Sequence, residues 1–290
     1  MKKILSVLLS LFFIFSFTSC SNNSNLNKPT FKIGALPDQN ASELTSAMTK
    51  MAEYLSNKTG LKVEYVQSVD YAALVTAFER GEIHLAWFGG LTGVQARNKV
   101  PTAEAIAQRP RDAEFHSVFI VQKNLPVNSI KDLKGLTFTF GSESSTSGHL
   151  MPRYYLLENG IYPEKDFNGK PNYSGSHDKT YKLVESGAFQ AGVLNEAVWQ
   201  KAVKDGKVDL SKVRAFYTTP AYFDYNWTIN GNVDEIFGNG TKDKVKNAIL
   251  SMGESEKEIL DFFQTDKFIE TKNDNYNAIE SVAKQLGIIK

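Results

Sequence analysis

From residue 31 onward, short apolar runs alternate with stretches whose apolar residues recur at helical spacing, and this alternation restricts the possible folds more than any other feature. Residues 31–35 form an apolar run, and apolar positions three or four residues apart follow from Leu44 to Leu55, ahead of Gly60. Such runs joined by amphipathic helices are typical of α/β proteins with parallel strands. The same reasoning predicts further strands over 61–67, 83–88, 117–121, 137–140, 213–218 and 225–229, and helices over 71–80, 148–159 and 275–286.

The order of strands and helices begins again after residue 117, which indicates two similar halves. About 260 residues also suit two domains better than one, because a single hydrophobic core stops growing near this size. No glycine- or proline-rich linker separates the halves, so strands are expected to pass directly between them as a stiff hinge beside a cleft. We predict a two-lobed α/β fold in which each lobe is a mixed sheet flanked by helices. Lobe 1 comprises residues 30–120 and 221–290, lobe 2 comprises residues 121–220, and two strands form the hinge.

The N-terminus has the layout of a secretory leader. Lys2 and Lys3 precede an apolar run over 4–17 that only single serines interrupt, and this order of charge and apolar residues is typical of an export signal. At fourteen residues the run is short for a membrane-spanning helix, which needs roughly 20. Removal of the leader, residues 1–19, takes away two lysines and no acid and changes the formal charge from +1 to −1. A body so close to neutral has no electrostatic footprint for nucleic acid.

The single cysteine of the chain, Cys20, directly follows this leader. The small residues Thr18 and Ser19 precede it, and the arrangement resembles the acylation site of bacterial lipoproteins, although Phe17 stands where leucine is usual. The alternative is an ordinary leader with an incidental cysteine nearby. With one cysteine no disulfide can form within the chain. We predict lipidation at Cys20, a flexible tether over 20–29, and an extracytoplasmic monomer that the lipid anchors to the cell membrane.

The segment 141–152, GSESSTSGHLMP, lies between a predicted strand and a predicted helix. Ser145, Thr146 and Ser147 place three hydroxyl groups beside the N–H groups of a helix start. These N–H groups and the positive end of the helix dipole favour an anion, and hydroxyl donors can complete its coordination. The alternative is plain helix capping, for which one serine or threonine suffices. Gly148 allows the backbone to approach closely, and we predict an oxyanion site here.

Six short motifs together resemble the phosphonate-binding (PhnD-like) proteins of phosphonate, phosphite and phosphate importers. The resemblance extends over nearly all of the chain, from residue 31 to about residue 287. It implies a type II periplasmic-binding-protein fold, capture of a small oxyanion between two lobes, and delivery to an ABC permease with its ATPase. The motifs HLMPRYY, FDYNW and FHS are most similar to a branch described as selenate-binding. The six motifs are DYAALV at 70–75, AWFGG at 86–90, SVFIV at 117–121, STSGHLMPRYY at 145–155, SGSHD at 174–178 and NEAVW at 195–199.

Carried over position by position, the resemblance implies a set of ligand contacts. Phe115 falls where similar phosphonate binders carry a tyrosine, so one hydroxyl contact is in question, and His84 replaces an acid that often precedes the AWFGG strand. The implied contacts are Tyr71, Ser145, Thr146, Ser147, His177, Glu196 and Asp224.

Two acids in this set limit the chemistry of the ligand. Carboxylates such as Glu196 and Asp224 repel an anion unless the ligand brings them a proton or an ammonium group. Phosphorus oxyanions with a second pKa of roughly 6 keep a proton near neutrality, whereas selenate and sulfate do not. We therefore expect a phosphonate, phosphite or phosphate, with selenate or sulfate as the alternative. The alternative to a ligand contact is that both acids are ordinary surface groups.

Other residues are weaker candidates for the site. Trp87 and Tyr222 lie at predicted strand ends and could wall the cleft, although buried aromatics usually belong to a core. Arg109 and Arg111, in QRPRD, could steer the anion or hold it with two hydrogen bonds, but an exposed loop is the more ordinary place for at least one of them. A lone histidine such as His177 is more often structural than functional, and its neighbours in SGSHD favour a donor role.

We expect a binding protein and not an enzyme, with no metal and no cofactor. No histidine pair shows the spacing that metal ligands usually need, and GSESS is not the GxSxG elbow of a serine hydrolase. Ser145 with His177 could still imitate a dyad, so a phosphoesterase is one alternative. A ligand sensor that docks to a signalling receptor is the other, and its site would be the same.

Overall fold

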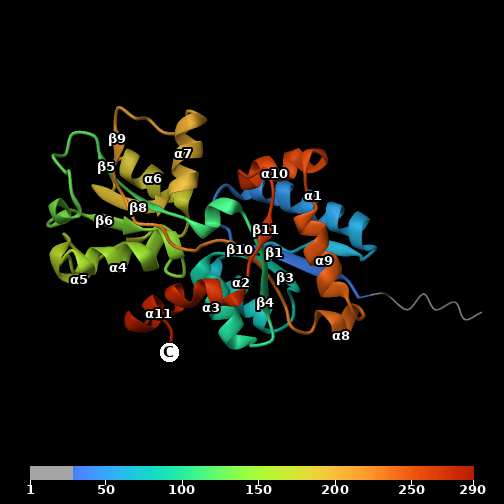
Figure 1. Ribbon diagram of the computed structural model, residues 1–290. Coiled ribbons are helices and arrows are strands. Elements are labelled where there is room, and N and C mark those ends of the chain that lie inside the picture. The colour runs from blue at the N-terminus through green and yellow to red at the C-terminus, as the bar shows by residue number, and fades with distance from the viewer. Residues whose placement is uncertain (1–28) are drawn as a thin grey trace, which may run out of the picture.

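The computed structural model describes residues 29–290 as two α/β lobes, each built on its own sheet (Figure 1). The predicted leader and Cys20 lie outside the described residues. Within residues 29–290, no helix combines the length and the apolar character that a membrane span requires.

The first lobe is built on a six-stranded sheet of strand order β11-β4-β10-β3-β1-β2. Strands β1, β2 and β3 pair in parallel, and β10 runs antiparallel between β3 and β4. Its strands are β1 (Phe31–Ala35), β2 (Val63–Tyr65), β3 (Leu85–Phe88), β4 (Glu104–Gln108), β10 (Asn226–Ile229) and β11 (Ile269–Glu270). Its helices are α1 (Ala41–Thr59), α2 (Tyr71–Glu79), α3 (Gly90–Lys99), α8 (Val233–Phe237), α9 (Thr241–Leu250), α10 (Lys257–Phe263) and α11 (Asn277–Gln285), with short 3₁₀ turns at Pro110–Ala113, Glu254–Glu256 and Asn273–Tyr276.

The second lobe has a five-stranded sheet of strand order β7-β6-β8-β5-β9. Its strands are β5 (Ser117–Gln122), β6 (Phe138–Phe140), β7 (Asn172–Tyr173), β8 (Ala191–Asn195) and β9 (Val213–Thr218). A 3₁₀ turn at Ile130–Leu133 precedes the π-helix η3 (Thr146–Leu150), which continues into α4 (Met151–Glu158), and α5 (Pro163–Asp166), α6 (His177–Glu185) and α7 (Glu196–Lys204) complete the lobe. Side chains of β5 alternate between two cores, with Phe119 and Val121 in one and Val118 and Ile120 in the other. This alternation follows from the two-residue period of a strand and covers both faces of the sheet.

Two segments connect the lobes. The chain leaves the first sheet after Gln108, enters the second at Ser117, and returns between Thr218 and Asn226. Between the sheets, Phe115 and Tyr222 form an antiparallel bridge that ties the two crossings together. Residues 117–121 pair fully with β8, so the second lobe begins a few residues before the predicted boundary at residue 121.

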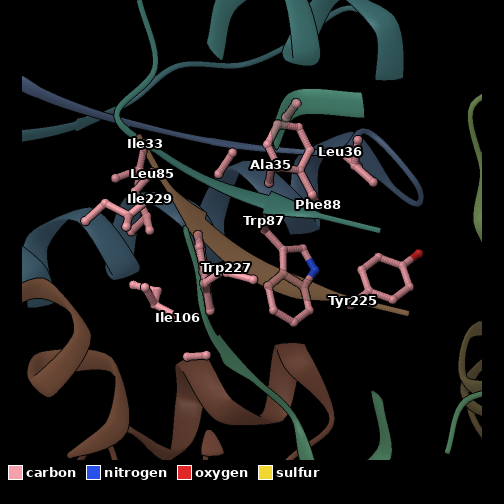
Figure 2. Close-up of a cluster of buried hydrophobic side chains, with 14 of the residues drawn as sticks. Ile33, Ala35, Leu36, Leu85, Trp87, Phe88, Ile106, Tyr225, Trp227 and Ile229 are labelled. Carbon is pink, nitrogen blue, oxygen red and sulfur yellow. The ribbon is translucent and has the colours of Figure 1, made fainter. Parts of the chain in front are cut away.

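The core of the first lobe reaches the gap between the lobes through three aromatic rings. Strand β3 is buried along its whole length, as expected for a central strand covered by helices on both faces. Trp87 on β3 lies between Trp227, 5.2 Å away between ring centroids, and Tyr225, which stacks on it at 5.5 Å. Figure 2 shows the three rings in a row, with Tyr225 just ahead of β10. Tyr225 is therefore held in place by the core behind it.

Candidate functional site

The site lies where the loop after β3 meets the helix start after β6. The Leu91 N–H at the start of α3 donates to Thr146 Oγ1 at 2.9 Å, and the Gly90 N–H donates to Asp224 Oδ1 at 2.9 Å. A Cβ atom on Gly89 would lie 3.1 Å from Asp224 Oδ1 and 3.2 Å from Thr146 Oγ1. A side chain at position 89 would thus crowd the Asp224 carboxyl group and the Thr146 hydroxyl of the other lobe.

The three hydroxyls of the STSG motif divide their roles. Ser145 is the N-cap of the helix, and its Oγ accepts the Gly148 N–H at 2.9 Å. The capping interpretation therefore holds for this serine. Thr146 and Ser147 follow in the first turn, where no helical carbonyl can receive their N–H groups, and both side chains are buried. The anion-site interpretation remains open to these two residues.

Three buried oxygen atoms near this turn make no hydrogen bond of ordinary distance and angle among the described residues, although Ser145 lies close enough to Tyr71, and Ser147 close enough to Asp224, to lower their pKa values. The three atoms are Tyr71 Oη, Ser147 Oγ and Asp224 Oδ2. Native proteins leave few buried polar atoms unpaired, because each one costs about 1–3 kcal/mol. Together with Thr146, these three residues are called the cradle below. Their unpaired atoms include two hydroxyl groups and one carboxyl oxygen, a set that suits a tetrahedral oxyanion carrying a proton.

Burial dominates the electrostatics of the cradle. It raises the pKa of Asp224 to about 7, against the opposing hydrogen bonds from the Gly90 N–H and the Thr146 hydroxyl. Burial, followed by the charges of Asp38 and Asp224, raises the pKa of Tyr71 well above 10. Tyr71 is therefore a neutral O–H donor at neutral pH, and Asp224 is close to the midpoint between a carboxylate acceptor and a carboxyl donor.

A second buried group, beside the cradle, joins the lobes through Tyr225. The Tyr225 hydroxyl donates to Asp38 Oδ2 at 2.7 Å, accepts from Asn195 Nδ2 at 3.2 Å and lies 3.4 Å from His177 Nε2. The backbone adds two links, from the Asn195 N–H to His177 Nδ1 at 3.3 Å and from the His177 N–H to the Asp38 carbonyl at 2.9 Å. We call Asp38, His177, Asn195 and Tyr225 the Tyr225 cluster.

The predicted ligand contact His177 belongs to this cluster. Its side chain is fully buried, and burial lowers its pKa to about 3, so the ring is neutral. Because Nδ1 accepts the Asn195 N–H, the ring proton lies on Nε2, where it faces the Tyr225 hydroxyl. Both ring nitrogens thus point at protein groups, and direct donation from His177 to a ligand stays a prediction.

Arg109 does not lie where a bidentate anion contact needs it. It is buried, and its Nε and Nη2 donate to the two oxygens of Asp112 at 2.8 and 2.6 Å, while Nη1 donates to the Phe263 carbonyl at 2.9 Å. All three guanidinium nitrogens of Arg109 thus bind protein groups, and an anion contact from Arg109 stays a prediction without support from these contacts. The carboxylate of Asp112, three residues away, accepts the hydrogen bonds of the planar guanidinium. The guanidinium carbon lies 5.3 Å from the ring centroid of Trp87 and 5.1 Å from that of Tyr225.

The remaining candidates line the surroundings of the site. Phe115 packs against Tyr225, with 5.6 Å between ring centroids, and the Tyr222 hydroxyl pairs with Ser117 Oγ at 2.6 Å. Trp87 walls a cavity of about 10 Å³ beside the Tyr225 cluster, which has room for about one water molecule. Glu196 is half-buried at the start of α7, and among the described residues it makes no hydrogen bond to the cradle.

Sequence reasoning missed Asp38, Asn195 and Tyr225. Two of them stand inside motifs that drew attention for a neighbour, since Asn195 precedes Glu196 in NEAVW and Tyr225 follows Asp224 in FDYNW. Asp38 had no such signal. A buried carboxylate in a loop after a strand becomes visible only through its partners.

The comparisons with known proteins agree with this architecture. Residues 33–276 match the family described as ABC transporter, phosphonate, periplasmic substrate-binding protein. The chain is 43% identical over 274 residues, 91% of this chain and 92% of the relative, to the probable ABC transporter phosphite binding protein PhnD1 of Prochlorococcus marinus (strain MIT 9301). It is 24% identical over 84% of its length, and over 74% of the relative, to the phosphonates-binding periplasmic protein of Escherichia coli (strain K12).

The solved structure of Prochlorococcus marinus PhnD1 in complex with methylphosphonate superposes with a TM-score of 0.87, at 42% identity, over 90% of this chain and 99% of that one. This chain therefore belongs to the family of periplasmic substrate-binding proteins of phosphonate ABC transporters. The family, the two-lobed α/β fold of type II periplasmic binding proteins and the role as the binding component of an ABC importer, all predicted from the motifs, are confirmed.

Proposed function

We propose that this protein captures a small phosphorus oxyanion, a phosphite, a phosphonate such as methylphosphonate, or a phosphate, between its lobes and delivers it to an ABC permease. One observation carries the proposal. Within residues 29–290, Tyr71 Oη, Ser147 Oγ and Asp224 Oδ2 are buried without partners beside the first turn of a helix. The names of the relatives, which bind phosphite or phosphonates, support the same ligand class.

The carboxyl group of Asp224 selects for a ligand that shares a proton. A P–OH group can donate to Asp224 Oδ2, or a protonated Asp224 can donate to a P–O⁻ group, so one proton satisfies both partners. Sulfate and selenate bring no proton near neutrality, so they suit only a protonated Asp224, whereas a phosphorus oxyanion with a P–OH group also suits the carboxylate. Against sulfate or selenate, an ionised Asp224 would be a buried, unpaired charge. The cradle therefore favours phosphorus oxyanions over protonless ions of the same shape.

The ligand binds by bridging the lobes. Ser147 and Thr146 belong to the second lobe, whereas Tyr71 and Asp224 belong to the first. A ligand that contacts all four residues is held only when the lobes are closed, and that differential contact shifts the equilibrium toward closure. The N–H groups of the helix start add a positive electrostatic field to the hydroxyl donors.

We further propose that the mature protein is a monomer tethered to the membrane by a lipid on Cys20. The leader-like run before this cysteine supports the anchor. An esterase role receives no support from the geometry, because among the described residues Ser145 and His177 share no hydrogen bond. Ser145 Oγ caps the helix, and the His177 ring pairs with Asn195 and Tyr225.

A thermal-shift screen followed by calorimetry tests the ligand class. Phosphite, phosphate, methylphosphonate, 2-aminoethylphosphonate, sulfate and selenate are compared at one concentration. A true ligand at 100 times its Kd stabilises the protein by about 2.7 kcal/mol. We expect at least one phosphorus oxyanion to raise the melting temperature and neither sulfate nor selenate to do so. Equal stabilisation by sulfate would contradict the proposed role of Asp224.

A further inference from the structure

The Tyr225 cluster joins the two lobes directly. Asp38 follows β1 and Tyr225 precedes β10, so both belong to the first lobe, whereas His177 begins α6 and Asn195 ends β8 in the second. All four side chains are at least nine-tenths buried. The hydrogen bonds from Asn195 Nδ2 to Tyr225 Oη and from the His177 N–H to the Asp38 carbonyl therefore cross from one lobe to the other.

The hydrogen-bonding capacity of Tyr225 is used within the protein. A phenol donates one hydrogen bond and accepts up to two. Tyr225 donates to Asp38 and accepts from Asn195, with His177 Nε2 as a second, longer neighbour. The cluster thus differs from the cradle, where Tyr71 Oη, Ser147 Oγ and Asp224 Oδ2 lack partners among residues 29–290. This saturation leaves Tyr225 without a strong bond to offer a ligand.

Each half of the cluster is packed against its own lobe. On the first lobe, Tyr225 stacks on Trp87 at an interplanar angle of 21°, and the Arg109 guanidinium lies 5.1 Å from its ring. On the second lobe, a Cβ atom on Gly148 would lie 3.2 Å from His177 Cε1. The imidazole is therefore packed directly under the helix turn that carries Thr146 and Ser147.

We propose that Tyr225 and Asn195 form a lock between the lobes, which stabilises the closed state without touching the ligand and so sets its dissociation rate. Asp38 orients the Tyr225 hydroxyl, and closure brings Asn195 and His177 onto it. The lock acts on every ligand by the same factor, whereas the cradle chooses among ligands. This inference rests on the proposed capture of an oxyanion by closure of the lobes.

The variant Tyr225→Phe removes the hydroxyl and keeps the stacked ring. We expect dissociation rates measured by stopped flow, and Kd values measured by calorimetry, to rise about ten- to hundredfold, as the loss of a hydroxyl that holds two or three buried bonds implies. The factor should be the same for phosphite, phosphate and methylphosphonate. Factors that differ between these ligands would mean that Tyr225 contacts the ligand, and an unchanged dissociation rate would mean that the lock does not exist.

Two further variants complete the test. Asn195→Ser retains an N-cap for α7, where Asn195 Oδ1 now accepts the Val198 N–H, but is too short to reach Tyr225. It should reproduce the Tyr225→Phe effect and keeps the test valid if that variant does not fold. Tyr54→Phe is the matched control, because this buried phenol bonds only within the first lobe, to the Ala248 carbonyl and to Ser251. It should lose thermal stability and keep the wild-type dissociation rate.

Failure of the lock can be separated from failure of the proposed ligand. If the wild-type protein binds none of the six ions in the screen, the ligand proposal fails. Spin-label distances between the lobes of the ligand-free protein then still test the lock. The closed distance should be less populated in Tyr225→Phe than in wild type, and equal populations would overturn the inference.

Discussion

Two tyrosine–aspartate pairs lie buried between the lobes, and they differ in how their polar atoms are used. In the cradle, Tyr71 Oη and Asp224 Oδ2 have no partner among the described residues. In the Tyr225 cluster, the Tyr225 hydroxyl donates to Asp38 Oδ2 at 2.7 Å and accepts from Asn195. Buried polar groups whose hydrogen bonds are all made within the protein fix the positions of their neighbours, whereas buried polar groups without partners can bind a ligand. We therefore propose that the same residue types serve binding in the cradle and closure in the Tyr225 cluster.

The two aspartates also differ in their electrostatic surroundings. Burial raises the pKa of Asp38 to about 6, and the hydrogen bond from Tyr225 and the charge of Arg109 oppose the rise. Burial raises the pKa of Asp224 to about 7, where the opposing groups are the Gly90 N–H and a hydroxyl. Asp38 has a nearby cation and Asp224 has none among these dominant influences, so Asp224 is better suited to share a proton with a ligand.

The largest expected effect comes from replacing the acid of the cradle. Asp224→Asn keeps the shape but puts an amide where we propose that the carboxyl group shares a proton with the ligand. Loss of a hydrogen bond involving a charged group costs about 1.5–3 kcal/mol, so calorimetry should show phosphite or phosphonate affinity falling by roughly 10- to 150-fold. The ratio of the affinity for phosphite or phosphonate to the affinity for sulfate should fall at the same time. Unchanged selectivity would mean that Asp224 does not discriminate, and the contrast between the two pairs would disappear.

Thr146→Ala tests the hydroxyl side of the cradle. The change also frees the Leu91 N–H, which now donates to Thr146 Oγ1. We expect calorimetry to show binding weakened by roughly 1 to 3 kcal/mol. Thr146→Ser, which retains the hydroxyl, is the matched control and should stay close to wild type. Equal losses in both variants would assign the effect to packing of the methyl group instead.

Ligand-free stability should depend on pH through Asp224. The unfolded chain releases the Asp224 proton near pH 3.8, whereas the folded protein retains it to about pH 7, so the folded state loses stability as pH rises through this window. Asp224→Asn lacks this loss. One unit of pKa shift corresponds to about 1.4 kcal/mol. Even part of the rise in the Asp224 pKa therefore makes the variant more stable than wild type by about 1 to 2 kcal/mol at pH 8. Thermal melts at pH 4 and pH 8 should show the difference only at the higher pH.

The smallest effect is expected from the exposed ion pair that also joins the lobes. Lys207 Nζ, on the second lobe, lies 2.8 Å from Glu43 Oε1 on α1, and both side chains are more than 40% exposed. Exposed pairs contribute about 0.2–1 kcal/mol, so Lys207→Ala should change the dissociation rate less than fivefold and should lose even this effect at high salt. If Lys207→Ala changed the dissociation rate as much as Tyr225→Phe, the surface ion pair and not the buried cluster would hold the lobes together.

The predicted elements mostly formed where the pattern of apolar residues was strong. Strands expected over 117–121 and 213–218 were found at Ser117–Gln122 and Val213–Thr218. The helix expected from Gly148 begins instead at Thr146, because Ser145 accepts the Gly148 N–H as its cap. Short strands such as β7 and β11 were missed, since two residues carry no periodicity.

The sequence by itself determined the alternation of strands and helices, the hydroxyl-rich helix start and the family, because each of these is written in neighbouring residues. Only the tertiary structure decided which polar groups remain unpaired. Asp38 and Tyr225 are separated by 187 residues, and Gly90 and Asp224 by 134. Whether a hydroxyl or carboxyl group is saturated depends on such distant partners, and chain folding alone brings them within hydrogen-bond distance.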